Sequence, residues 1–240
     1  MSAYRRAADQ CRGDVSRPMA LLADKHILCF NDYVSASQDL SLVKQLEPGG
    51  LFVASAYGGD DIQTMALAEL LAERNATVVI YDHCFSACAS YLLTASSRAI
   101  VLKDALVAWQ VLGAEQGDCL QFVQALDKGP QRYDVGRCPQ PLSRIGEAGK
   151  IYQAKQRFFE KRRIDPLLEE PPESAFVRTS ISNLFSRLKY TELVMWTWNP
   201  RYYASSIKTN IVYEAYPKSQ REVDAISKRL RLFYPVIYDP

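Results

Sequence analysis

Ser86 and two cysteines stand close together in the stretch DHCFSACAS, residues 82–90, and all three side chains are capable of covalent chemistry. Ser86 lies between Cys84 and Cys88, after a strand-like apolar run and before an apolar helical pattern. A serine at a strand-to-helix turn is the arrangement of a nucleophile elbow. The other interpretation is a tightly packed junction in which Ser86 is an N-cap or a small packing residue.

A similar junction lies one strand earlier, where Gly58 and Gly59 follow an apolar run and precede a helical pattern. Glycine lets a ligand approach the backbone closely, and the first amides of a helix favour negative charge. Open α/β folds build their sites at the carboxyl ends of strands, so we expect both junctions at one edge of a sheet. Together they fit acyl transfer, in which Ser86 attacks and the amides hold the oxyanion. Alone, the two glycines equally predict a turn that leads into a helix.

The surrounding pattern alternates strands with helices. Continuous apolar runs predict buried strands, and apolar residues at helical spacing predict helices. The expected strands are 26–34, 51–56, 75–82 and two pieces within 99–110, and the expected helices are 35–46, 61–74, 86–96, 147–164 and 219–232. This alternation predicts an α/β fold with parallel strands and right-handed crossovers.

The periodic pattern breaks at about 113–147, which indicates a loop-rich insertion. We expect an N-terminal segment at 1–24, a core at 25–200, and an aromatic-rich C-terminal extension at 201–240 that packs on the core. Core and interface packing explains the aromatic residues of the extension better than base stacking, because no basic patch is interleaved with them.

Composition limits the classes of partner. The 240 residues are 48% hydrophobic, which is enough for one sizeable core. Lys and Arg number 29 against 27 Asp and Glu, so net charge favours neither nucleic acid nor an acidic membrane surface. No apolar run is long enough to span a bilayer, and the first residues lack the apolar region of a signal peptide. We therefore expect no nucleic acid partner, no membrane span and no cofactor.

The chain has six cysteines, an even number that suits three disulfides in an oxidising compartment. Proximity along the chain suggests the pairs Cys11 with Cys29, Cys84 with Cys88, and Cys119 with Cys138. Six free thiols in a reducing cytosol are the alternative. Metal binding by His83, Cys84 and Cys88 is a third interpretation, and it lacks a fourth ligand at a recognisable spacing.

The segment SAYGGDDIQTMALAELLAERNATVVIYDHCFSACASYLLTASSRAIVLKDALVAWQ resembles the core of the Clp protease proteolytic subunit and crotonase superfamily. The similarity covers about residues 25–112 and is greatest to bacterial, often periplasmic, Clp-like proteins with a C-x-S-A-C serine motif. It implies a β-β-α superhelix, usually oligomeric, with Ser86 as the nucleophile. It also implies an oxyanion hole formed by Gly58 and Gly59 and by the amide of Ala87. A periplasmic or secreted location follows from the resemblance, with the cytoplasm as the alternative.

The chain departs from the family pattern at the general base. The family has a histidine at the end of a strand resembling ALVAWH, and Gln110 stands at that position here. An amide does not take up a proton near neutral pH, so Gln110 is not a general base. His83, or a base supplied by a partner subunit, remains as an alternative. We assign no triad acid among the candidates Asp165, Glu169, Glu170 and Glu173.

The missing base favours a catalytically impaired protein or pseudoenzyme that binds a peptide or protein. The alternative is an active serine peptidase or hydrolase that uses Ser86 with a non-standard base, either His83 or one supplied by a partner subunit.

 We expect self-association into a homo-oligomer in either case. Two further interpretations of the sequence remain open. In the first, Gln110 is an engineered replacement of the general-base histidine that was made to trap a substrate complex. An acyl-CoA-handling crotonase enzyme would use the same oxyanion hole without an obligate serine, and the Ser86 motif with its flanking cysteines argues against it.

Overall fold

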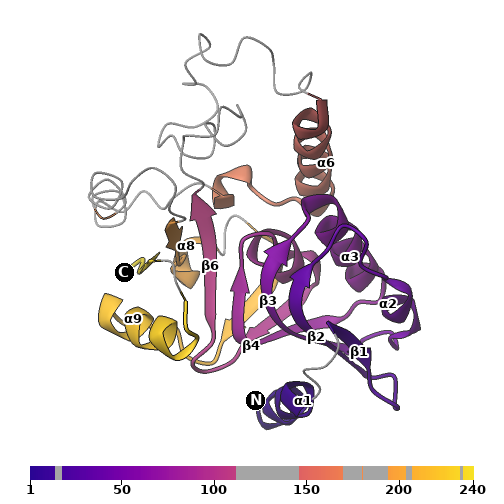
Figure 1. Cartoon of the computed structure of the whole chain (residues 1–240), viewed down its shortest axis with the longest axis horizontal. Helices are drawn as coiled ribbons and strands as arrows, with labels where there is room; N and C mark the ends of the chain where they lie inside the picture. The colour runs from indigo at the N-terminus through magenta and orange to yellow at the C-terminus, as the bar shows by residue number, and fades with distance from the viewer. Residues whose placement is uncertain (14–17, 112–145, 170–179, 181–193, 204–206, 233–234) are drawn as a thin grey trace.

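Apolar runs of strand length form the centre of the fold. The computed structural model describes all residues except 14–17, 112–145, 170–179, 181–193, 204–206 and 233–234 (Figure 1). Its strands are β1 (Met19–Leu21), β2 (Ile27–Val34), β3 (Leu51–Gly59), β4 (Thr77–Phe85), β5 (Arg98–Val101), β6 (Leu106–Val111), β7 (Val194–Trp196), β8 (Asn210–Tyr213) and β9 (Val236–Ile237). They join in one nine-stranded mixed sheet, so the predicted α/β class is confirmed.

The central strands of the sheet are parallel, as the alternating pattern predicts. The main order is β1-β2-β3-β4-β6-β7-β9, in which β2, β3, β4 and β6 run parallel to one another. β1 is antiparallel to β2, and β7 is antiparallel to β6. The C-terminal residues contribute to the sheet itself, since β8 pairs with β5 and β9 pairs with β7.

β4 divides the sheet at an irregular step. Ala54 and Ala56 of β3 pair with Ile80 and Cys84 of β4, so β4 contains two extra residues between these pairs. Before the step β4 pairs with β5, and after it β4 pairs with β6. A bulge of this kind bends a strand and redirects its side chains. It therefore turns the end of β4, with the segment that contains Ser86, toward β6.

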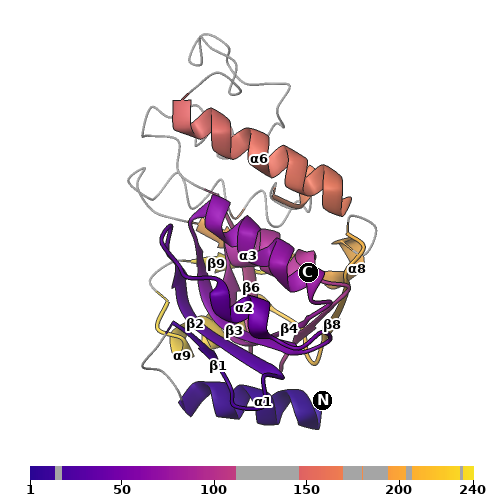
Figure 2. The same cartoon turned by 90° about the vertical axis from the view of Figure 1, so that its right-hand side faces the viewer.

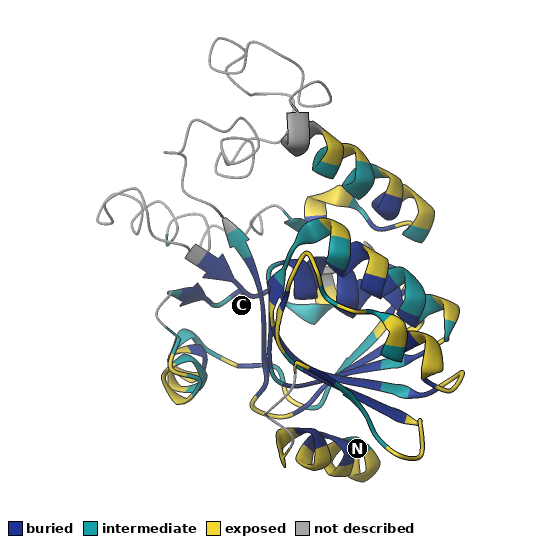
Figure 3. Cartoon of the chain, turned by 45° about the vertical axis from the view of Figure 1, so that its right-hand side comes forward, coloured by how far each residue is buried: buried dark blue, intermediate teal, exposed yellow. Residues whose placement is uncertain are grey.

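Helices cover both faces of the sheet (Figure 2). One face carries α2 (Ser41–Gln45), α3 (Asp61–Glu73), the π-helical turn η1 (Cys88–Leu92) with α4 (Leu93–Ala95), and α6 (Gly146–Arg162). The opposite face carries α1 (Ser2–Gly13) and α9 (Gln220–Arg229), and the chain also forms η5 (Pro166–Glu169) and α8 (Pro200–Tyr203). The strands are largely buried between these layers, whereas α1 and α9 expose their outer sides (Figure 3). No helix within the described ranges is long and apolar enough to cross a membrane.

The strand ends differ from the sequence prediction in a way that matters for the site. The strand expected at 51–56 continues through Gly59, and the strand expected at 75–82 continues through Phe85. Residues predicted as turns thus remain in the ladder and reach the carboxyl edge of the sheet. The insertion expected at about 113–147 and the Cys119–Cys138 pair lie outside the described residues.

Candidate functional site at the ends of β3 and β4

The two junctions identified in the sequence meet in the structure. Gly58 has a φ of 93°, and a Cβ atom built on it would lie 3.2 Å from Ser86 Cβ. The same atom would lie 2.7 Å from the Phe85 carbonyl oxygen and 3.0 Å from the Ala87 amide nitrogen. Only glycine fits this approach at this φ. The backbone around Ser86 and Ala87 therefore packs directly on Gly58.

Gly59 has a different neighbour. Its φ is 149°, and a Cβ atom there would lie 2.2 Å from the Val34 carbonyl oxygen. The next residue, Asp60, donates its amide to the same Val34 oxygen at 2.8 Å. The Asp60 side chain accepts a hydrogen bond from the Gln63 amide and thereby caps α3. Gly59 thus holds β3 and the start of α3 close to β2, while Gly58 lies at Ser86.

Ser86 adopts the backbone geometry of an elbow. It is a half-buried residue with a φ of 53°, in the left-handed region that non-glycine residues seldom occupy. Its amide donates to the Ala108 carbonyl oxygen at 3.0 Å, and its own carbonyl accepts from the Ser90 amide at 3.0 Å. These two bonds join the end of β4 to β6 and to the first helical turn. A strained serine at a strand-to-helix turn is typical of a nucleophile elbow.

Ser86→Gly is expected to raise the free energy of unfolding by about 1 kcal/mol, because glycine occupies the left-handed region without a Cβ penalty. Ser86→Ala keeps the Cβ atom and serves as the matched control, with an expected change within about 0.5 kcal/mol. Urea unfolding of the three proteins measures both values. A glycine variant no more stable than the alanine variant would show that the serine is not strained in solution.

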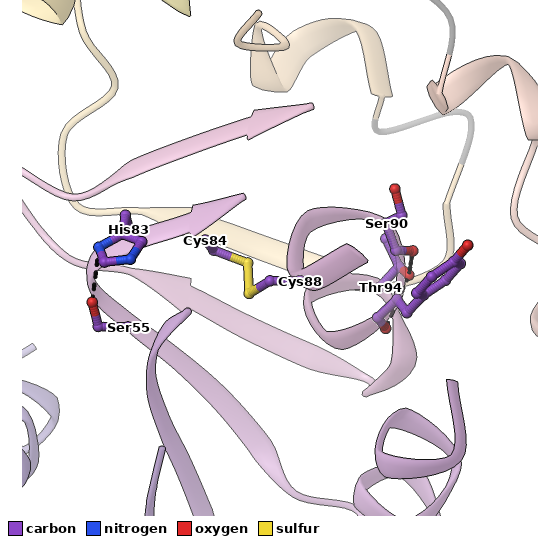
Figure 4. The surroundings of a disulfide bond; sticks show 7 residues. Ser55, His83, Cys84, Cys88, Ser90 and Thr94 are labelled. Atoms are coloured by element: carbon purple, nitrogen blue, oxygen red, sulfur yellow. Dashed lines mark hydrogen bonds between the residues drawn. A yellow bond between two sulfur atoms is a disulfide. The ribbon is translucent and has the colours of Figure 1, made fainter. Parts of the chain in front are cut away.

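A disulfide joins the two cysteines that flank Ser86 in the sequence. Cys84 and Cys88 are bonded, with their Cα atoms 5.2 Å apart, and both residues are fully buried. Figure 4 shows this bond between the end of β4 and the following helix. Cys11 and Cys29 form a second disulfide, so two of the three predicted pairings are confirmed, and the third, Cys119 with Cys138, lies outside the described residues. Metal binding by His83 with the two enclosing cysteines is ruled out as an interpretation, because both sulfurs are used in the bond.

His83 is hydrogen-bonded to a different serine, Ser55. Its Nδ1 atom lies 2.9 Å from Ser55 Oγ, and both residues are buried (Figure 4). Burial lowers the pKa of His83 to about 4, against a smaller raising effect from Asp82. Among the described residues, Nε2 of His83 has no hydrogen-bond partner, and no hydrogen bond joins the ring to Ser86. This arrangement does not support His83 as the general base for Ser86.

The Ser55–His83 pair was not anticipated from the sequence. The available signal was a polar residue, Ser55, within the otherwise apolar run LFVASA. Alternation along β3 and β4 does not predict their contact, because the irregular step in β4 shifts its register against β3.

Gln110 lies on the strand that adjoins the elbow. It is half-buried near the end of β6 and pairs with Met195 of β7. Ala108, two residues earlier on the same strand, accepts the hydrogen bond from the Ser86 amide. Since side chains alternate along a strand, Gln110 shares the side of β6 on which Ala108 lies. Within the described part of the chain, no hydrogen bond joins the Gln110 amide to Ser86.

The described candidates for the triad acid form contacts with other residues and not with Ser86 or His83. Asp165 accepts from the Leu167 amide at 3.0 Å and so stabilises η5. Glu169 forms an ion pair with Lys155 of α6. Glu170 and Glu173 lie outside the described residues.

A partly buried polar cluster that the sequence pattern did not indicate begins two residues after the glycine turn. Asp61, the first residue of α3, is hydrogen-bonded to the buried Tyr91 hydroxyl, and burial raises the pKa of Asp61. The Lys155–Glu169 ion pair acts on the same carboxyl. These contacts connect the two helices that start at the site with α6 and η5. Within the described ranges, no group of three or more His, Cys, Asp or Glu side chains is arranged to hold a metal ion.

No protein-family model matches the sequence, and a search of curated proteins finds no match. The site is therefore defined by its geometry: a strained serine, a glycine turn packed against it, an enclosing disulfide, and a glutamine on the adjoining strand.

Proposed function

We propose that this protein has the β-β-α superhelix of the Clp protease and crotonase superfamily and uses a serine hydrolase-like site to bind a peptide or protein. The observation that carries the proposal is the junction of Gly58 with Ser86, in which a serine at positive φ packs against a glycine turn. An elbow of this kind presents a hydroxyl and backbone amides at the carboxyl edge of a sheet. Such groups suit the carbonyl oxygen of an extended chain.

Binding rather than cleavage is supported by the histidines. The chain has two. His83 is bonded to Ser55, and His26 lies beside Glu47, with 3.9 Å between Nδ1 and the carboxylate. Without a general base, the Ser86 hydroxyl is a weak nucleophile. An active peptidase would need a base from a partner subunit, and the labelling experiment below separates the two functions.

The two disulfides support a periplasmic or extracellular location, where such bonds persist. Self-association is part of the same proposal and follows from the family resemblance.

Labelling with a fluorophosphonate probe tests the proposal. The unmodified protein is expected to remain unlabelled, because no hydrogen bond joins either histidine to Ser86 among the described residues. Gln110→His is expected to gain labelling, because a histidine at this position would supply the base. The double variant Gln110→His/Ser86→Ala is the control and should lose the label, which peptide mapping should place on Ser86.

Labelling of the unmodified protein at Ser86 would show an active hydrolase and would contradict the binding proposal. Labelling of neither the unmodified protein nor Gln110→His would contradict the placement of the base at residue 110.

A further inference from the structure

Tyr57 is an exposed aromatic residue directly beside the glycine turn. Its side chain lies at the end of β3, immediately before Gly58, and the residue is 45% exposed. Single exposed aromatics are ordinary on protein surfaces and alone indicate nothing. The contacts beneath this ring distinguish it from such a residue.

The Tyr57 ring is supported by two buried rings. Its centroid lies 4.1 Å from that of His83 and 6.2 Å from that of Phe85, and the His83 and Phe85 centroids are 5.0 Å apart. His83 is in turn fixed by its contact with Ser55 at 2.9 Å. An aromatic side chain that is already ordered loses little conformational entropy when a ligand packs on it.

The imidazole ring beneath Tyr57 contains one polar atom that is unpaired within the described part of the chain. A buried polar group without a hydrogen-bond partner destabilises a fold, and His83 Nε2 has no partner among the described residues. An apolar residue at position 83 would avoid this penalty but would lose the bond that fixes the ring to Ser55. Held by Ser55 and packed against Tyr57, the imidazole ring is placed to orient the exposed face of that tyrosine.

We propose that Tyr57, oriented by His83 and Phe85, is the specificity-determining contact of the site and selects an aromatic or large aliphatic side chain of a bound peptide. The inference rests on the proposed peptide-binding function. The Ser86 hydroxyl and the backbone at Gly58 and Ala87 bind the carbonyl of the peptide, and the adjacent tyrosine ring packs against the side chain. Aromatic rings favour such neighbours through both buried area and ring geometry.

The test is an NMR titration of the full chain with the peptides Ac-Ala-Ala-Xaa-Ala-Ala-NH2, in which Xaa is Phe, Leu, Ala or Asp. We expect the Phe peptide to bind about tenfold more tightly than the Ala peptide. Tyr57→Ala is expected to reduce the affinity for the Phe peptide to that for the Ala peptide. Tyr57→Phe should preserve the preference to within about threefold, because it keeps the ring.

Tyr33→Ala is the matched control. Tyr33 is a comparably exposed tyrosine, at 54%, on the neighbouring strand β2, and it makes no ring contact with the described residues. Its removal is expected to leave the Phe preference unchanged. Equal loss in Tyr33→Ala and Tyr57→Ala, or a preference that survives in Tyr57→Ala, would overturn the inference.

Two other outcomes separate the inference from the function on which it rests. If all four peptides bind equally well, the site binds peptides and the role of Tyr57 is wrong. If no peptide binds, the proposed function fails and the inference fails with it. An oligomer that Tyr57→Ala dissociates, measured by sedimentation, would assign the ring to a subunit contact and likewise overturn the inference.

Discussion

Gly59→Ala is expected to destabilise the protein by about 4 kcal/mol or more, or to prevent folding. The added Cβ atom would lie 2.2 Å from the carbonyl oxygen, 2.6 Å from the amide nitrogen and 2.7 Å from the Cα of Val34. All three are backbone atoms of a buried strand, so no flexible side chain is available to move away. The φ of 149° adds conformational strain for any residue with a Cβ.

Gly49→Ala is the control for this prediction. Gly49 also has a positive φ, of 78°, but no atom lies within 4 Å of its added Cβ. Its substitution therefore isolates the conformational term, which is about 1 kcal/mol. Urea unfolding of both variants measures the difference. Equal destabilisation by the two substitutions would show that β3 does not approach β2 as closely as the structure indicates.

This close approach is part of the site, although the atoms nearest a Cβ on Gly59 belong to Val34 and not to Ser86. It places the amide of Asp60 on Val34 and so fixes the first turn of α3. Gly58, one residue earlier, is thereby held against the elbow. A variant that separates β3 from β2 is expected to lose the geometry at Ser86 as well.

Local features of the sequence predicted much of this arrangement. The apolar runs around 51–56 and 75–82 identified two central strands, and the double glycine and Ser86 identified the residues at their ends. The Cys84–Cys88 pair was predictable because its partners are four residues apart, on either side of one turn. These features depend on neighbouring residues, which periodicity and spacing describe well.

The parts that could not be predicted depend on contacts between distant segments. The pairing of Ser55 with His83 requires the irregular step in β4, which no periodic pattern reveals. The approach of Lys155 and Glu169 to Asp61 depends on how α6 packs against α3. The sequence contained these polar residues, but their partners were fixed only by tertiary packing.

His83 is expected to make stability depend strongly on pH. Burial lowers its pKa in the folded protein to about 4, below the ordinary value of 6.5. Between these two pH values the unfolded chain binds a proton that the folded protein does not, so stability rises with increasing pH across this window. The contribution of His83 is fully present above pH 6.5 and is lost as the pH falls toward 4. A shift of this size corresponds to about 3 kcal/mol.

His83→Phe isolates this contribution from that of the carboxylates, which also titrate below neutral pH. The phenyl ring keeps the packing against Tyr57 and Phe85, and the loss of the hydrogen bond to Ser55 lowers stability equally at every pH. Urea unfolding at pH 4.5, 5.5 and 7 is expected to show a shallower pH dependence in the variant, by about 2 to 3 kcal/mol over this range. Parallel curves for the two proteins would mean that His83 titrates normally. The imidazole would then be exposed to water in solution. It would not be the buried, fixed ring that the proposed role of Tyr57 requires.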